Sequence, residues 1–106
     1  MYYIFNAAAS FNQPLNDWNV ESVTDMTSMF YKVATFNQPL DDWNVASVTG
    51  MKNMFNYATD SNQPLNDWNV AGVINIMLGM FNYETNFNQP LDDWNVSSVN
   101  NMGRLF

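Results

Sequence analysis

The chain contains no cysteine and no histidine, and these two absences exclude several kinds of chemistry. Without them there is no disulfide, no thiolate or imidazole metal site, and no Ser-His or Cys-His nucleophile pair. Basic residues are also scarce: three Lys and Arg stand against ten Asp and Glu, which gives a formal net charge of −7. The sequence therefore predicts no nucleic-acid partner and no attraction to anionic membranes, because both carry negative charge.

Long apolar runs are missing as well. No stretch of the chain reaches the ~20 apolar residues that a membrane-spanning helix requires, and the first residues lack the basic start and apolar run of a secretion signal. We therefore expect no membrane insertion of this segment. Apolar residues nevertheless make up 47% of the 106 residues, which is enough for the core of one domain.

The chain does contain an internal repeat. The ten residues FNQPLNDWNV begin at Phe11 and return with few changes at Phe36, Ser61 and Phe87, so that successive copies are 25, 25 and 26 residues apart. Repeats of this length predict a stack of like units that share one core. The single repeat domain 1–106 is divided into units of about 5–29, 30–54, 55–80 and 81–105, with the extra residue within 76–80. We expect it to be a segment of a longer array.

Two apolar patterns within each unit predict two kinds of secondary structure. The first is the L-x-x-L-x-L-x-x-L signature of leucine-rich repeats, carried here by Leu15, Trp18, Val20 and Val23. It predicts a short strand with Trp18 pointing inward. From about 23 to 33, apolar side chains then recur at three- and four-residue steps, which predicts a helix capped by Ser22 and Asp25. The expected fold is an α/β leucine-rich-repeat-like solenoid, with a four-stranded parallel sheet on one face and short helices on the other.

Stacking predicts columns of equivalent residues. We expect the Trp column and the inward-facing Met residues to be buried, rather than to form a binding surface. We also expect the Asn-Gln pairs that precede each Pro to hydrogen-bond the backbone of the neighbouring unit. Ser61 interrupts a Phe column, so that Ser61→Phe is predicted to fill a cavity. On the outer surface, Lys32, Tyr57 and Tyr83 share one position, where they form a plausible contact patch.

The repeat unit resembles that of the BspA-type leucine-rich-repeat proteins. Residues 29–51, MFYKVATFNQPLDDWNVASVTGM, follow the unit MF-x-x-A-x-x-F-N-Q-P-L-x-x-W-N-V-S-x-V-T-x-M almost letter for letter. This resemblance extends over essentially the whole chain. It implies a bacterial cell-surface or secreted protein, in some cases a lipoprotein, that adheres to surface proteins of a host or of a neighbouring cell. It carries over no catalytic residue.

The outward columns of the predicted strands are the candidate binding surface. They are expected to face a protein partner and consist of Asp17, Asn19, Asp42, Asn44, Asp67, Asn69, Asp93 and Asn95. The four Asp could also supply oxygen ligands to calcium, but a solvated acidic stripe is the interpretation that we favour. Identical acids on a flat stripe lack the unlike environments that a glycosidase requires, so no catalytic residue and no cofactor are predicted.

Two functions follow from this pattern. The first is a non-catalytic adhesion or binding module that presents acidic and amide columns. The alternative is a structural spacer with no ligand of its own. In either case the uncapped ends predict self-association through exposed apolar residues. These are Ile4, Phe5 and Phe11 at the start, and Val99, Met102, Leu105 and Phe106 at the end.

Overall fold

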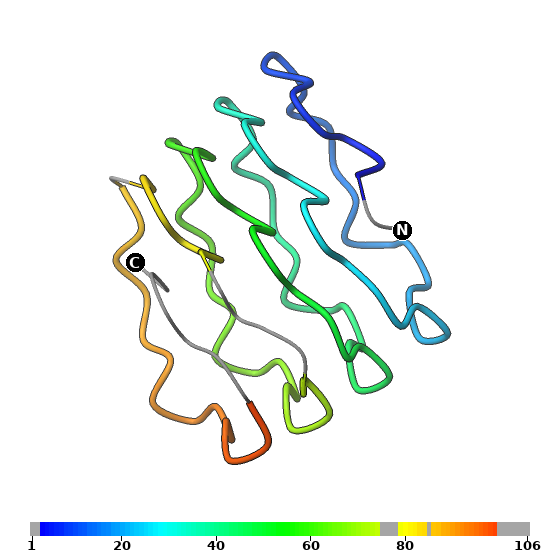
Figure 1. Ribbon diagram of the computed structural model, residues 1–106. Coiled ribbons are helices and arrows are strands. Elements are labelled where there is room, and N and C mark those ends of the chain that lie inside the picture. The colour runs from blue at the N-terminus through cyan, green and yellow to red at the C-terminus, as the bar shows by residue number, and fades with distance from the viewer. Residues whose placement is uncertain (1–2, 75–78, 85, 100–106) are drawn as a thin grey trace.

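The chain folds into stacked coils made of turns. The computed structural model describes residues 3–74, 79–84 and 86–99, and within these ranges it has no helix and only one isolated parallel bridge, Asp25 to Gly50. The predicted α/β leucine-rich-repeat-like solenoid, with its parallel sheet and helices, is therefore wrong. Each unit instead forms one flat coil, and successive coils lie side by side in sequence order (Figure 1).

The segment predicted to be a helix is a run of consecutive turns. The N–H groups of Met29 and Val33 donate to carbonyl oxygens three residues back, those of Met26 and Phe30, at 3.2 and 3.1 Å. An α-helix would instead bond four residues back. Ser28, the expected helix interior, has a φ of 56°, in the left-handed region that interrupts a right-handed helix. Because a turn brings its first and fourth residues close together, consecutive turns reproduce the apolar spacing of a helix.

The remaining N–H groups of this segment bond the next coil. Met26 and Phe30 donate to the carbonyl oxygens of Gly50 and Met54, each at 2.9 Å. The bond of Phe30 recurs between the first and second coils, from Phe5 to Met29, and between the third and fourth, from Phe55 to Met80. N–H groups thus alternate between the turn and the next coil, so the backbone is satisfied without a helix. We call segments 3–8, 26–33, 51–58 and 79–84 the turn ladder.

The segment predicted to be a strand also consists of turns. The N–H of Trp18 donates to the carbonyl oxygen of Leu15, and that of Val23 to the carbonyl oxygen of Val20, both at 2.9 Å. The predicted capping box is wrong as well, because the Asp25 Oδ1 accepts the N–H of Thr27 at 2.9 Å and closes a local turn. The leucine-rich-repeat spacing is therefore produced here by two short turns rather than by a strand.

Side-chain amides join the coils where no sheet is present. The Oδ1 of Asn12 accepts the N–H of Asn37 at 3.0 Å, and the Nε2 of Gln38 donates to the carbonyl oxygen of Asn12 at 3.2 Å. The same pair of bonds recurs from Asn37 to the third coil and from Asn62 to the fourth. The structural interpretation of the Asn-Gln pairs is confirmed.

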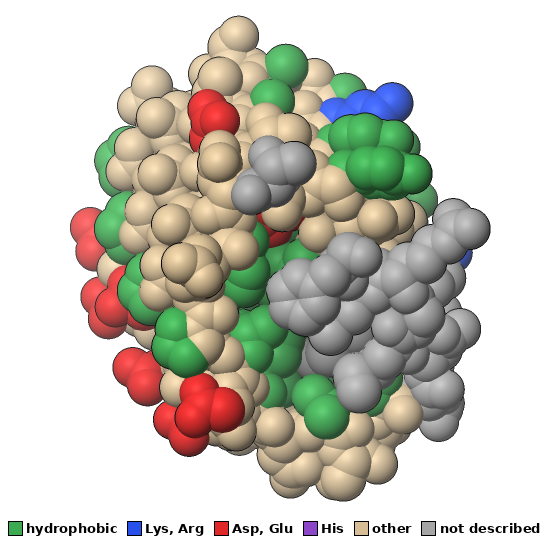
Figure 2. All heavy atoms as spheres, turned by 90° about the vertical axis from the view of Figure 1, so that its left-hand side faces the viewer, with side chains coloured by type: hydrophobic (Ala, Val, Ile, Leu, Met, Phe, Trp, Pro, Cys, Tyr) green, Lys and Arg blue, Asp and Glu red, His purple; other side chains and the backbone are tan. Residues whose placement is uncertain are grey.

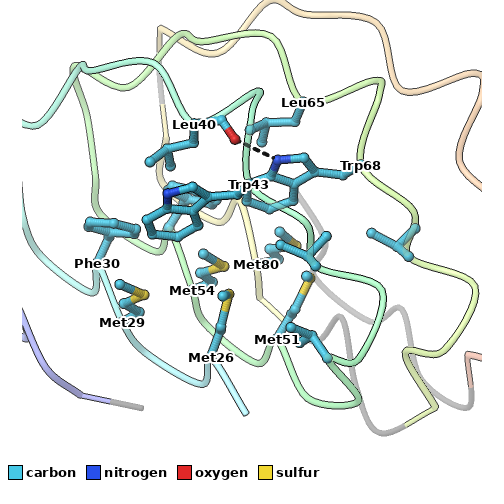
Figure 3. Close-up of a cluster of buried hydrophobic side chains, with 14 of the residues drawn as sticks. Met26, Met29, Phe30, Leu40, Trp43, Met51, Met54, Leu65, Trp68 and Met80 are labelled. Atoms are coloured by element: carbon cyan, nitrogen blue, oxygen red, sulfur yellow. Dashed lines mark hydrogen bonds between the residues drawn. The ribbon is translucent and has the colours of Figure 1, made fainter. Parts of the chain in front are cut away.

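Tryptophan and methionine side chains fill the core between coils. The Nε1–H groups of Trp43, Trp68 and Trp94 donate to a Leu carbonyl of the preceding coil at 2.8–2.9 Å, and Figure 3 shows the bond from Trp68 to Leu40. Burial of the Trp column is confirmed for these three but is wrong for Trp18, which is 41% exposed because no preceding coil covers it. Burial is also confirmed for Met26, Met29, Met51, Met54 and Met80; Met1, Met77 and Met102 lie outside the described residues.

Two Phe columns run beside the Trp column. Phe30 stacks on Phe55 of the next coil at 5.4 Å between ring centroids, and it also stacks on Phe36 of its own coil at 4.4 Å. Ser61 replaces the second Phe in the third coil and is 5% exposed. The Glu84 side chain of the fourth coil lies next to the Ser61 hydroxyl. The Glu84 carboxyl group therefore lies beside Ser61, where the sequence predicted a cavity.

The coil ends expose part of the predicted apolar surface. Ile4 is 52% exposed, whereas Phe5, Phe11 and Val99 are partly buried against the core. Met102, Leu105 and Phe106 lie outside the described residues, as does most of the expected insertion within 76–80.

Candidate functional site

An acidic stripe runs along the outside of the stack. All four of its carboxylates are exposed, and we call the column of Asp17, Asp42, Asp67 and Asp93 the acidic stripe. Figure 2, seen from the left-hand side of Figure 1, shows acidic side chains gathered along one side of the molecule. The stripe lies in turns rather than on strands, because the first turn of each repeat motif holds the Asp before its Trp.

Two of the four stripe carboxylates are held by an Asn of the preceding coil. The Asn16 Oδ1 accepts the N–H of Asp42, and its Nδ2 donates to the Asp42 Oδ2, both at 3.0 Å. Asn66 holds Asp93 in the same way, at 3.0 and 2.9 Å. No such bond joins Asp41 to Asp67, because Asp41 has no amide to donate. The stripe is thus clamped at alternate steps.

The predicted Asn column is exposed but partly engaged in local structure. The Oδ1 atoms of these residues accept a backbone N–H two residues ahead at 3.1 Å, which closes an Asx-turn in every coil. The residues concerned are Asn19, Asn44, Asn69 and Asn95. Their Nδ2 groups have no hydrogen-bond partner among the described residues. The Asn column can therefore donate hydrogen bonds to a bound protein, but it has few free acceptors.

No metal site is apparent near the acidic stripe. Within 3–74, 79–84 and 86–99 no three Asp or Glu side chains are grouped closely enough to hold a metal ion. Calcium at Asp17, Asp42, Asp67 and Asp93 is an alternative that only the sequence pattern supports.

A buried carboxyl, which the sequence analysis missed, lies in the core. Both oxygens of Glu84 are shielded from solvent and have no hydrogen-bond partner among the described residues. Burial raises the pKa of Glu84 to about 9, and the nearby Ser61 hydroxyl opposes this shift although its geometry falls short of a hydrogen bond. Glu84 is therefore protonated at neutral pH. The repeat alignment could have identified Glu84, because it places this acid at the position that Ala8, Val33 and Ala58 occupy in the other units.

The turn ladder carries an exposed aromatic surface. Tyr57 and Tyr83 are 39% and 55% exposed, and their rings stack at 4.4 Å with an angle of 10° between planes. The Lys32 Nζ lies 5.3 Å from the Tyr31 ring centroid and 5.7 Å from that of Tyr57. We call these four residues the Tyr–Lys ridge. Loss of solvent around the ring, followed by the influence of Tyr83, raises the pKa of Tyr57.

Comparison with known proteins gives one family. No curated protein and no solved structure showed a significant match. In the described part of the chain, no helix is long and apolar enough to cross a membrane. The family described as "Mycoplasma protein of unknown function, DUF285" matches residues 1–78 and 62–106, which together span the whole sequence. The chain belongs to this family.

Proposed function

We propose that this chain is a non-catalytic binding module of a bacterial surface protein, with the acidic stripe and the adjoining Asn column as its partner surface. The observation that carries the proposal is the arrangement of exposed carboxylates in one column, two of them fixed by Asn16 and Asn66. Fixed charges lose little conformational entropy on binding. The BspA-like repeat unit supports a surface location and an adhesive role.

A basic surface is the partner that this face fits. Four carboxylates in one column, on a chain of net charge −7, favour Lys- or Arg-rich segments and repel acidic ones. Short arrays offer few such contacts, so binding by this chain alone is expected to be weak. Longer arrays gain by engaging several sites at once.

The proposal can be tested with a fluorescent octalysine peptide and fluorescence anisotropy. The chain is expected to bind octalysine at low salt and to lose affinity as salt rises. Asp17→Asn combined with Asp67→Asn removes two stripe charges and should weaken binding. The matched control, Glu21→Gln with Asp60→Asn, removes two exposed charges outside the stripe and should weaken it much less. Equal losses in the two variants would show attraction to net charge and would contradict a specific stripe surface.

A structural spacer is the second candidate, and one observation favours it. The amides of the repeat motif, such as Asn12 and Gln38, bond between coils and are not available to a ligand. A spacer predicts no octalysine binding that depends on the stripe, whatever the number of units in the array.

A further inference from the structure

The Tyr–Lys ridge has features that packing of the core does not require. Lys32, Tyr57 and Tyr83 occupy one repeat position in consecutive coils, and all three have positive φ, at 61°, 62° and 58°. This region is unfavourable for bulky aromatic residues, and Gly or Asn would adopt it at lower cost. Tyr nevertheless occurs there twice, with its ring exposed to solvent. Strained aromatic residues on a surface point to a role in contact with a partner.

The charge on this surface is opposite to that on the acidic stripe. The turn ladder carries Lys32 and Lys52, and its only acid is Glu84, which is buried. Exposed acids lie on the remaining half of each coil. Figure 2 shows a hydrophobic patch with a basic side chain next to it, on the side away from the acidic edge. One face of the molecule therefore presents a column of donors, an ammonium and two phenols, and the other presents a column of carboxylate acceptors.

The two columns have the same repeat distance because the same stack produces both. At the ridge itself the rings of Tyr57 and Tyr83 lie 4.4 Å apart, whereas equivalent core rings are farther apart, up to 6.4 Å for Trp43 and Trp68. An extended acidic peptide presents same-side carboxylates about 6.6 Å apart, which is wider than the 4.4 Å between the Tyr57 and Tyr83 rings. A second stack keeps register along its whole length.

We propose that the Tyr–Lys ridge docks onto the acidic stripe of a second copy of this chain, so that arrays associate side by side. The inference rests on the proposed binding role of the stripe and names its partner. Lys32 and the hydroxyl groups of Tyr57 and Tyr83 donate to successive carboxylates of the other copy. Since ridge and stripe are different surfaces, the contact is heterologous, and each bound copy leaves one ridge and one stripe free for the next.

Sedimentation velocity on the whole chain tests this proposal with two complementary variants. The ridge variant, Lys32→Gln/Tyr57→Phe/Tyr83→Phe, removes the donors but keeps the rings. The stripe variant carries Asp→Asn at positions 17, 42, 67 and 93. Wild-type protein is expected to self-associate at high concentration and at moderate salt, which screens the repulsion between two copies of net charge −7 while the short-range contacts between ridge and stripe persist. Each variant alone should associate at least about tenfold more weakly, as the loss of several charge-assisted hydrogen bonds predicts.

Mixing the two variants gives the sharpest result. The ridge variant keeps its stripe and the stripe variant keeps its ridge, so an equimolar mixture should form a dimer of one copy of each and stop there. Circular dichroism and melting of both variants establish that they fold. A monomeric wild-type protein at all concentrations, association that both variants retain, or a mixture no larger than its components would each overturn the proposal.

Octalysine separates this proposal from the proposed function. If wild-type protein binds octalysine through the stripe but does not self-associate, the stripe is a binding surface and a second copy is not its partner. If the chain self-associates as described but octalysine binding does not depend on the stripe, the ridge–stripe contact is correct and a general role in binding basic partners is not. An octaglutamate peptide that binds the ridge without any self-association would identify a different acidic partner and also overturn the proposal.

Discussion

Whether neighbouring coils are clamped along the acidic stripe depends on one side chain in each coil, which is either Asn or Asp. Asn16 and Asn66 each place an amide donor on the stripe carboxylate of the next coil, whereas Asp41 at the same repeat position faces Asp67 with a second carboxylate. One step in the stack therefore replaces a hydrogen bond with like-charge repulsion. The alternation of Asn and Asp is visible in the sequence, but its meaning depends on which side chains meet across the coils.

Asp41→Asn is expected to complete the missing clamp. The new amide would accept the N–H of Asp67 and donate to its carboxylate, which should raise the free energy of unfolding by about 0.5–1 kcal/mol. Chemical denaturation measures this change. Glu21→Gln is the control, because it removes an exposed charge without a clamp and should have a smaller effect. Asn66→Asp should have the opposite sign, and a gain in that variant would contradict the clamp.

Glu84 is expected to make stability depend on pH. The folded pKa, about 9, lies above the unfolded value of 4.5, so well below pH 4.5, where both states are protonated, Glu84 adds no pH dependence to the stability. As pH rises toward 9, the unfolded chain releases the proton that the folded chain retains, and stability falls by at most about 1.4 kcal/mol per pH unit. Above that pH the folded state ionises too, and the loss levels off.

Thermal melting of wild type and Glu84→Gln between pH 5 and pH 9 measures this contribution. The difference in melting temperature should move in favour of the Gln variant as pH rises, since the amide cannot ionise. Asp92→Asn, an exposed acid, should give a nearly constant difference. Parallel curves for wild type and Glu84→Gln would show that Glu84 ionises normally in the folded state.

The predicted gain from Ser61→Phe requires revision, because Glu84 lies next to Ser61. Phe at this position would meet the carboxyl, so we expect Ser61→Phe alone to be destabilising. Combined with Glu84→Ala, which restores the Ala that the third coil has at this position, the Phe column would be continuous and the double variant should be more stable than wild type by about 1 kcal/mol or more. Denaturant unfolding of the two single variants and the double variant yields the coupling energy, and simple additivity would exclude contact between the two side chains.

At the scale of the element, the apolar pattern fixed burial but not backbone conformation. Met29, Trp43 and the Asn-Gln pairs were placed correctly because their environment depends only on the repeat period. Helix and strand were wrong because spacings of three and four residues also arise from consecutive turns. The usual marker of such turns is Gly or Asn at positive φ; Asn53 and Gly79 provide it in the later coils, but Ser28, Lys32 and Tyr57 occupy other positive-φ positions. The Tyr–Lys ridge was identified as a patch, but its stacking and strain require coordinates.

Ala7 provides a direct test of the turn ladder. It is exposed and has a φ of 59°, where a Cβ costs about 1 kcal/mol or more. Ala7→Gly relieves this cost but also adds freedom to the unfolded chain, so the free energy of unfolding should rise by about 0.5 kcal/mol. Ala9 is also exposed but has no positive φ, so Ala9→Gly should lower stability by about 0.5–1 kcal/mol through added freedom of the unfolded chain. Equal effects of the two substitutions in a denaturation experiment would contradict the turn geometry.

On the scale of the whole molecule, bonds between coils connect each unit only to its neighbours. Ser28 and Phe30 donate to the next coil, as their equivalents Tyr3 and Phe5 do, while contacts between distant coils are absent from the described hydrogen bonds. A terminal coil is held on one side and an internal coil on two. Unfolding is therefore expected to begin at the ends and to proceed by nearest neighbours.

This arrangement has a mechanical consequence. Tension applied to the two ends would act on the bonds between coils, and the coil held on one side only would detach first. Each detached coil of about 25 residues adds roughly 85 Å of extended chain, at ~3.4 Å per residue. Single-molecule force spectroscopy should record a series of equal lengthening steps, and release of the whole chain in one step would contradict this view. Such a chain would behave as an extensible tether, which yields by one repeat at a time and keeps the remaining coils folded under load.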